Sequence, residues 1–390
     1  MADTENNKNS NSPALRFHGF TDPWKPVTLG DVTFNFNRRN KECKEYPMYS
    51  VTNNRGFIPQ NEQFEDREMV GEDIKSYKII ERGEFAYNPA RINVGSIARY
   101  VGSEPCMISS LYVCFKPSNE VDGSFLLQFL KSPKANFYYN ANGEGGVRIY
   151  LFYPNFARIR TAIPSLSEQC KISSFLKLLD ERISTQRRLI EDLEKLKSSI
   201  VDRTFSDVDG EVVKYRDLLE VSNLRNDGKA DYRILSASQE FGMIERESLD
   251  IDIKAEAKSV KAYKRVQAGD YVLHLRSFQG GLAFAEVGGI CSPAYTILRP
   301  NKRLEYGYLK EYFKSSKFIK SLVFVTYGIR DGRSINVDEF LDMTISIHSK
   351  DKQAEIVKSL SILSVKLNVE ASILNIYEQQ RNYLHGNLFI

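Results

Sequence analysis

Few stretches of this sequence have the residue types and spacing that catalysis requires. The tetrapeptide YNPA (87–90) lacks the second proline and the aromatic residue of an Asn-Pro-Pro-aromatic methylation motif, and no glycine-rich nucleotide loop precedes it. Asp252 and Lys254 have the Asp-x-Lys spacing of some nucleases, but such triplets arise often by chance. The chain contains neither a GxxxxGK[ST] phosphate loop nor a G-x-S-x-G nucleophile elbow. We therefore predict no catalytic residues and interpret YNPA as a turn that ends a strand.

The histidines and cysteines give no metal-binding pattern either. None of the four histidines has a carboxylate or cysteine at the spacing of a zinc site. The five cysteines are odd in number and form no CxxC pair, so we expect reduced, buried thiols. The sequence therefore predicts no metal site and no cofactor bound by this chain.

A long helix is the element around which the rest of the chain is organised. Ser165 and Glu168 have the spacing of a capping box, which satisfies free amides at a helix start. The residues that follow recur in alternating steps of four and three, and no Gly or Pro interrupts them as far as Val208. Such a seam is typical of a helix packed lengthwise on another helix. Its positions are Ile172, Leu176, Leu179, Ile183, Gln186, Ile190, Leu193, Lys197 and Ile200.

A second copy of this helix ends the chain. Adding 184 to each position places Gln169 on Gln353 and Phe205 on Phe389. Even the polar interruptions of the seam match, since Gln186 falls on Glu370 and Lys197 on Arg381. Generic helix composition would supply apolar matches but not these polar ones. We therefore predict an internal duplication.

The duplication extends into the segments that precede each helix. At a shift of 186, Tyr77 and Lys78 meet Tyr263 and Lys264, and FLLQFLKSPK (125–134) meets YLKEYFKSSK (308–317) at 183. Short stretches rich in Val, Ile, Tyr and Phe alternate with Gly, Asn and Pro turns, which favours strands. We expect an α+β fold with two similar strand-rich domains. Predicted strands are 48–52, 84–87, 111–115, 233–237, 270–275 and 294–298, and predicted helices are 123–132 and 305–317.

The domain boundaries follow from this repeat. We predict a disordered tail at 1–21, domains at 22–163 and 206–347, and long helices at 164–205 and 348–390. Lys+Arg against Asp+Glu is 18 to 16 in the first domain and 21 to 21 in the second, so net charge alone does not indicate nucleic-acid binding. The N-terminus lacks a hydrophobic signal core, and no apolar run approaches the roughly 20 residues of a membrane span, so we expect a cytoplasmic protein.

The order of domain, helix, domain, helix predicts antiparallel helices. A helix of about 35 residues spans on the order of 50 Å. Parallel helices would require the second domain to hold its ends that far apart, although its expected radius of gyration is about 14–15 Å. We therefore expect an antiparallel pair, with a pseudo-twofold relation between the two domains.

The sequence resembles the specificity (S) subunits of type I restriction-modification systems over residues 22–390. The resemblance is carried by the layout, by IPSLSEQCKISSFLKLLDERI (163–183) and LIEDLEKLKSSIVDRTF (189–205), and by YNPARINVGSI (87–97). It implies two target-recognition domains that each read half of a bipartite, asymmetric site in double-stranded DNA. It also implies partners: two methyltransferase (M) subunits docked on the helices, and restriction (R) subunits. S-adenosylmethionine, ATP and Mg are implied for those partners. The second helix start, ISIHSKDKQAEI (345–356), departs from this pattern because it lacks the Pro and Glu of the first.

Candidate DNA-binding residues lie in polar, glycine-bearing loops beside strands. Reading of a sequence requires side chains that bond base edges, such as Arg with guanine and Asn or Gln with adenine, while phosphate contacts supply affinity. For each residue the alternative is an ordinary turn or surface residue. The candidates of the first domain are Asn53, Asn54, Arg55, Arg91, Asn93, Arg99 and Arg148, and those of the second are Gln239, His274, Arg276, Gln279, Arg330 and Arg333.

YGIRDGR (327–333) is the strongest of these loops, because two arginines flank a glycine-containing turn just before the second helix. Arg333→Ala should abolish specific DNA binding and leave subunit assembly intact. Unchanged affinity and an unchanged methylation pattern in that variant would remove Arg333 from the candidates.

Two other classes of function remain open from the sequence alone. One is a self-contained methyltransferase or nuclease with duplicated domains, which would modify or cleave DNA without partners. The other is a coiled-coil adaptor that binds proteins at both ends, which would show no salt-sensitive, sequence-dependent DNA affinity.

Overall fold

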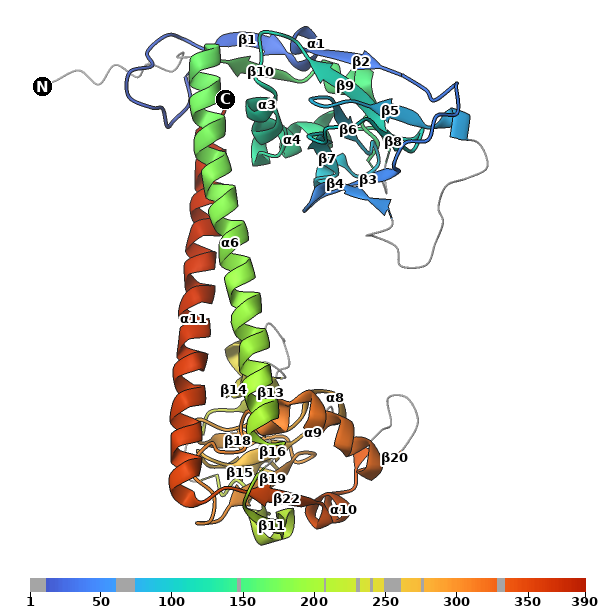
Figure 1. Cartoon of the computed structure of the whole chain (residues 1–390). Helices are drawn as coiled ribbons and strands as arrows, with labels where there is room; N and C mark the ends of the chain where they lie inside the picture. The colour runs from blue at the N-terminus through green and yellow to red at the C-terminus, as the bar shows by residue number, and fades with distance from the viewer. Residues whose placement is uncertain are drawn as a thin grey trace, which may run out of the picture. The chain divides into compact units, whose positions relative to one another are not determined.

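The computed structural model describes residues 12–60, 74–145, 149–206, 208–228, 232–238, 241–248, 261–274, 277–327 and 334–390 (Figure 1). Two compact units are present. Unit 1 contains residues 1–186 and 373–390, and unit 2 contains residues 187–372. Each unit includes part of both long helices, α6 (Leu166–Thr204) and α11 (Lys350–Asn387).

Unit 1 is built on a four-stranded antiparallel sheet, and three two-stranded pairs surround that sheet. The sheet order is β2 (Thr33–Phe36), β9 (Val113–Pro117), β6 (Phe85–Tyr87) and β7 (Ile97–Arg99). The pairs are β1 (Lys25–Thr28) with β10 (Arg160–Ile163), β3 (Tyr49–Thr52) with β4 (Gly56–Pro59), and β5 (Lys78–Ile80) with β8 (Cys106–Ile108). The short helices are α1 (Leu29–Val32), η1 (Ile74–Ser76), η2 (Ile92–Val94), α3 (Gly123–Leu130), α4 (Pro133–Asn142) and α5 (Tyr153–Ala157).

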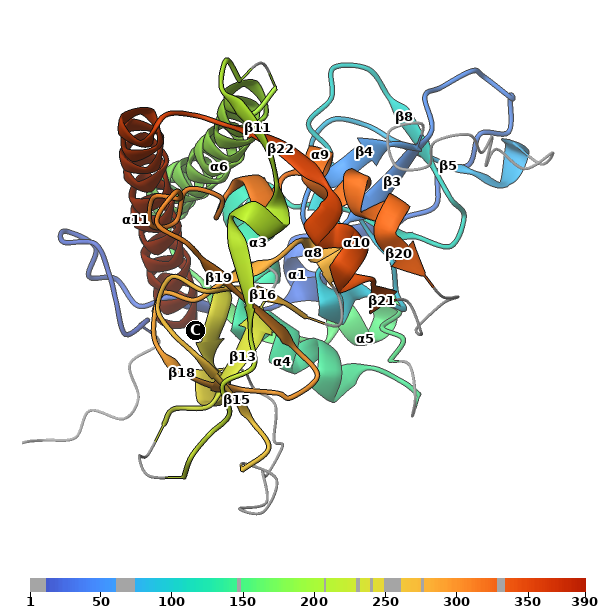
Figure 2. The same cartoon turned by 90° about the horizontal axis from the view of Figure 1, so that it is seen from below.

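Unit 2 repeats this arrangement. Its sheet order is β12 (Leu219–Ser222), β19 (Thr296–Pro300), β16 (Tyr271–Leu273) and β17 (Ala283–Phe284). Its pairs are β11 (Glu211–Lys214) with β22 (Thr344–Ile347), β13 (Leu235–Ser238) with β14 (Gly242–Glu245), β15 (Lys264–Val266) with β18 (Gly289–Cys291), and β20 (Thr326–Tyr327) with β21 (Ser334–Ile335). The short helices are η3 (Tyr215–Asp217), η4 (Arg246–Ser248), α8 (Ser277–Gly280), η5 (Tyr312–Lys314), α9 (Ser316–Ser321), η6 (Leu322–Val325) and α10 (Val337–Asp342). Of these, α8, α9 and α10 lie on one side of β16 and β19 in both views (Figure 1, Figure 2).

Every strand of unit 1 has a counterpart in unit 2, and the described residues of unit 2 add the pair β20–β21. The order β2-β9-β6-β7 corresponds to β12-β19-β16-β17, and each of the three surrounding pairs of unit 1 has a counterpart in unit 2. Even single bridges repeat, since Arg39 faces Lys78 in unit 1 and Arg225 faces Lys264 in unit 2. The expected α+β fold with an internal repeat is therefore confirmed.

The prediction of one continuous helix over 305–317 is wrong. Residues 306–311 form turns, followed by η5 and then by α9. Gly307 has φ +77°, a left-handed conformation that an α-helix does not contain. Ser315 then starts a new helix, because its side chain accepts a hydrogen bond from the Phe318 amide.

Inside each unit the two long helices run in opposite directions. In unit 1 the start of α6 packs with the last residues of the chain, since Ile172 and Leu176 share one core with Leu388 and Phe389. In unit 2 the end of α6 packs with the start of α11. The antiparallel arrangement follows from these cores. The predicted seam differs at one position: Ile200 is 37% exposed, and its neighbour Val201 is buried instead.

The matching seam residues Lys197 and Arg381 each bind an acidic partner. The Arg381 Nε donates to the Asp180 Oδ1 at 2.6 Å, which joins α11 to α6 within unit 1. At the matching position of unit 2, the Lys197 Nζ lies 2.7 Å from the Glu311 Oε2. The polar interruption that Lys197 and Arg381 share is therefore an ion pair in each unit.

Of the tail that was expected to be disordered (1–21), residues 1–11 lie outside the described residues, and residues 12–21 differ from that expectation. In residues 12–21, the Leu15 amide donates to the Asn387 carbonyl at 2.9 Å, and Phe17 packs edge-on against Phe175 of α6. The Arg16 guanidinium bonds both carboxylate oxygens of Glu168, at 2.8 and 2.7 Å. The predicted capping box is therefore only half formed. The Glu168 amide donates to the Ser165 hydroxyl, but the Glu168 carboxylate binds Arg16.

His385 lies buried at the end of α11, and its Nε2 lacks a hydrogen-bond partner. Burial, followed by the charge of Arg381, lowers its pKa from the ordinary 6.5 to about 4. The unfolded chain therefore binds a proton at a pH where the folded chain does not, so stability is complete above about pH 6.5 and falls as the pH decreases toward 4. We expect a loss of roughly 3 kcal/mol at the acid end.

Urea unfolding of the wild type and of His385→Leu between pH 4 and 7.5 checks this expectation. The variant should lack that part of the acid decline. Parallel pH profiles for the two proteins would contradict the assignment.

Candidate nucleic-acid interface

The tip of the β3–β4 hairpin presents Asn53, Asn54 and Arg55, all of which are exposed. The Thr52 hydroxyl closes the turn, because it accepts from the Arg55 amide at 3.2 Å and donates to the Gly56 carbonyl at 3.1 Å. Gly56 has φ +68°, which few other residues adopt. This turn chemistry orients three side chains with the donors and acceptors that base edges require.

Two hollows lie beside this hairpin. The larger, of about 580 Å³, is lined by Asn54, Arg55, Arg99 and Lys131, with Tyr49, Phe57 and Tyr100 among its aromatic residues. The smaller, of about 260 Å³, is lined by Asn53 and Arg91, together with Gln60, Asn88 and Ser96. Five of the candidates from the first domain therefore meet around one hairpin.

Arg99 and Lys131 reach the larger hollow from different elements. Arg99 ends β7, and its Nη1 donates to the Ser124 Oγ at 3.0 Å. Lys131 follows α3, and burial, followed by the charge of Arg381, lowers its pKa. Lys131 was not among the predicted residues, because an apolar helix with one lysine at its end is an ordinary surface pattern. An anionic group in this hollow would favour the charged form of Lys131.

Asn88, in the segment that follows β6, has a structural role. Its side-chain oxygen accepts from the Ala90 amide at 3.0 Å, so YNPA is the strand-ending turn that was predicted. Arg91 is exposed. Asn93 does not line either hollow; its Nδ2 donates to the Asn140 Oδ1 at 3.3 Å.

In unit 2 the described candidate residues do not gather around one hairpin. His274 is only 9% exposed, and its ring packs edge-on near Tyr295, so it offers little surface to a base. Gln279 is exposed in α8. The remaining candidates lie outside the described residues: Arg148 of unit 1, and Gln239, Arg276, Arg330 and Arg333 of unit 2.

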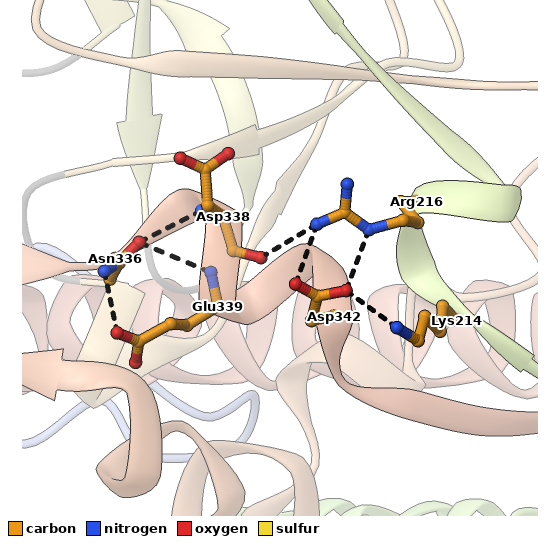
Figure 3. Close-up of polar contacts among 6 residues, drawn as sticks. All are labelled: Lys214, Arg216, Asn336, Asp338, Glu339 and Asp342. Atoms are coloured by element: carbon orange, nitrogen blue, oxygen red, sulfur yellow. Dashed lines mark hydrogen bonds and ion pairs between the residues drawn. The ribbon is translucent and has the colours of Figure 1, made fainter.

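The described residues next to 328–333 are firmly held. Tyr327 pairs with Ser334 in the β20–β21 ladder. Asn336 then caps α10 by accepting from the amides of Asp338 and Glu339 at 3.1 and 3.3 Å (Figure 3). The described residues on both sides of 328–333 therefore belong to one two-stranded ladder.

A surface ion-pair network secures the other end of α10. The Asp342 carboxylate accepts from the Lys214 Nζ at 3.0 Å and from the Arg216 Nε at 2.9 Å (Figure 3). These two hydrogen bonds lower the pKa of Asp342. Both cations are thus engaged with α10, which makes this network a structural joint between β11, η3 and α10.

The thiols are only partly as expected. Cys106, Cys114 and Cys291 are buried, and burial raises the pKa of each to about 12, but Cys43 and Cys170 are exposed. Within the described part of the chain, no group of His, Cys, Asp and Glu side chains could hold a metal ion. No helix in that part is both long and apolar enough to cross a membrane.

Comparisons with known proteins bear on this geometry. Residues 21–195 match the family model of the type I restriction modification DNA specificity domain. Over 195 residues the chain is 24% identical to the specificity subunit of the type I restriction enzyme HindI from Haemophilus influenzae. That match covers 48% of this chain and 41% of the relative, so the chain spans about two-fifths of that relative's length.

Solved structures match over nearly the whole chain. The type I restriction-modification S subunit from M. genitalium aligns with TM-score 0.57 and 12% identity, over 97% of this chain and 99% of that one. A chain from a structural study of complex assembly and conformational transition in the type I R-M system aligns with TM-score 0.58 and 16% identity, over 95% and 98%. These identities are low, so the likeness concerns the fold.

Proposed function

We infer that this chain, whose residues 21–195 match the model of the type I restriction modification DNA specificity domain, is the DNA-reading subunit of a type I restriction-modification complex. That family is defined by DNA specificity and not by a catalytic reaction. The duplication of one α+β unit within one chain carries the proposal, because two similar readers on one polypeptide suit a bipartite site. The units differ in sequence, so the two half-sites should differ and the whole site should be asymmetric.

The hairpin of unit 1 supports the reading role. Its exposed Asn53, Asn54 and Arg55 present the amide and guanidinium groups that pair with adenine and guanine edges. Lys131, in the adjoining hollow, offers positive charge for the phosphate backbone, which supplies affinity and register.

We further propose that α6 and α11 dock two methyltransferase subunits, and that restriction subunits join the complex. Several apolar side chains on these helices remain exposed, as expected of surfaces that a partner covers. They include Leu178 at 64%, Leu196 at 51%, Ile362 at 63% and Ile376 at 59% exposure. In this proposal S-adenosylmethionine, ATP and Mg belong to the partner subunits.

Mapping of methylated adenines on single DNA molecules tests the proposal. Cells with and without this chain should differ in one asymmetric, bipartite motif with a constant spacer, and restored expression should restore it. The purified chain with DNA and S-adenosylmethionine, but without partners, should transfer no methyl group. Identical maps in the two cell lines, or methylation or cleavage by the chain alone, would refute the proposal.

A further inference from the structure

The strand pairs β3–β4 and β13–β14 occupy the same place in the two units, and the described residues at their turns share one hydrogen bond. In unit 1 the Arg55 amide donates to the Thr52 Oγ1 at 3.2 Å; in unit 2 the Phe241 amide donates to the Ser238 Oγ at 3.2 Å. Each is followed by a glycine with positive φ, +68° at Gly56 and +78° at Gly242. Equivalent positions therefore carry an arginine in unit 1 and a phenylalanine in unit 2.

Both side chains are exposed, and Phe241 is 63% exposed. A single exposed aromatic residue is common on protein surfaces and carries no argument by itself. The sheet beneath each hairpin supplies a second observation. Arg99 faces Phe85 on the neighbouring strand, and the matching register in unit 2 places Phe284 opposite Tyr271. At this position, too, an arginine of unit 1 corresponds to a phenylalanine of unit 2.

A third position changes in the opposite direction. Leu127 of α3 lines the hollow of unit 1 beside Arg99. Its counterpart in the repeat, Lys310, lies with its ammonium 5.7 Å from the centre of the Phe284 ring and pairs with Glu286. The charge that lysine adds is balanced by this carboxylate. At the first two positions, unit 1 thus has the guanidinium groups of Arg55 and Arg99, and unit 2 has the aromatic rings of Phe241 and Phe284.

We infer that these two tips distinguish the half-sites: Arg55 donates to the edge of a guanine, and Phe241 contacts the methyl group of a thymine. Guanine presents two acceptors, O6 and N7, in the major groove, which arginine bonds as a pair. The thymine methyl group is the apolar feature of that groove, and phenylalanine is among the side chains that contact it. This inference rests on the proposed function.

Adenine-methylation mapping of variants in cells that produce the chain's own partner subunits tests the inference. Arg55→Ala should relax one G·C position in one half-site, and Phe241→Ala one A·T position in the other, each with a roughly 10- to 100-fold loss of discrimination. The reciprocal exchange, Arg55→Phe with Phe241→Arg, should change the preferred base at both positions. Arg82→Ala, at an exposed arginine that lines neither hollow, is the matched control and should leave the motif unchanged.

The outcomes separate this inference from the proposed function. A wild type that methylates no bipartite motif would refute the proposed function itself. A wild-type motif that stays unchanged in the Arg55 and Phe241 variants would refute only the inference. So would a fall in occupancy without relaxed sequence, because that is the signature of a phosphate contact. Melting temperatures, together with the milder Arg55→Gln and Phe241→Leu, show whether a lost motif results from unfolding.

Discussion

Replacing Gln169 with leucine should lower the free energy of unfolding by about 3 kcal/mol. The Gln169 side chain is fully buried at the start of α6. Its Oε1 accepts from the Asp122 amide at 2.7 Å, and its Nε2 donates to the carbonyls of Pro164 and Glu120 at 2.9 and 3.1 Å. Leucine fills a similar volume but leaves these three main-chain groups without their partner. Urea unfolding followed by circular dichroism measures the loss.

The repeat supplies a second test at the start of α11. Gln353 accepts from the Glu305 amide at 2.7 Å and donates to the carbonyls of Arg303 and His348 at 3.1 and 3.0 Å, so Gln353→Leu should cost a similar amount. Gln380→Leu, at an exposed position of α11, is the matched control and should change stability by less than about 0.5 kcal/mol. If Gln169→Leu lowered the free energy of unfolding as little as this control, the three hydrogen bonds of Gln169 would contribute little to stability.

Truncating Phe389 to alanine should cost about 3–5 kcal/mol, because it removes a buried aromatic ring and leaves a cavity. Phe389 is 4% exposed, and its ring centre lies 5.4 Å from that of Phe125 and 5.9 Å from that of Phe129. These contacts tie the end of the chain to α3 within unit 1. Urea unfolding of the variant measures the loss.

Phe205 is the counterpart of Phe389 in unit 2. It is 8% exposed, and its ring centre lies 5.3 Å from that of Tyr308 and 4.7 Å from that of Tyr312, so Phe205→Ala should cost a comparable amount. Phe137→Ala removes a ring that is 67% exposed and should have a small effect. If Phe389→Ala were no more destabilising than Phe137→Ala, the last residues of the chain would not belong to the core of unit 1.

The internal repeat could be recognised from the sequence because a buried polar residue is costly and therefore informative. Gln169 and Gln353 each make the same three hydrogen bonds to equivalent main-chain groups. Apolar matches alone would have fitted many helices. The polar matches at one shift indicated two copies of one packing arrangement.

The errors arose where a local pattern has more than one physical solution. Ser165 and Glu168 have the capping-box spacing, but the Glu168 carboxylate binds Arg16, which lies far away in the sequence. The segment 305–317 has the composition of a helix, yet Gly307 interrupts it with a left-handed conformation. In each case a contact or a backbone angle overrode the local preference.

The candidate site, too, could be predicted from the sequence only in part. Glycine-bearing turns with exposed Asn and Arg could be identified from their residue types, and the structure places Asn53, Asn54 and Arg55 at one hairpin tip. The sequence could not place Lys131 in the hollow with Arg55 and Arg99, because these residues come from three different elements. The repeat shift of 186 already aligned Arg55 with Phe241, but it could not show that both residues follow matching two-stranded pairs and are exposed there.

The sequence by itself therefore determined the repeat, the long helices and the strand-rich character of both units, because periodicity and composition are properties of neighbouring residues. Only the tertiary structure decided which charges pair, which seam residue is buried and which side chains share a hollow. Those properties depend on residues far apart in the chain that come into contact only when the chain folds.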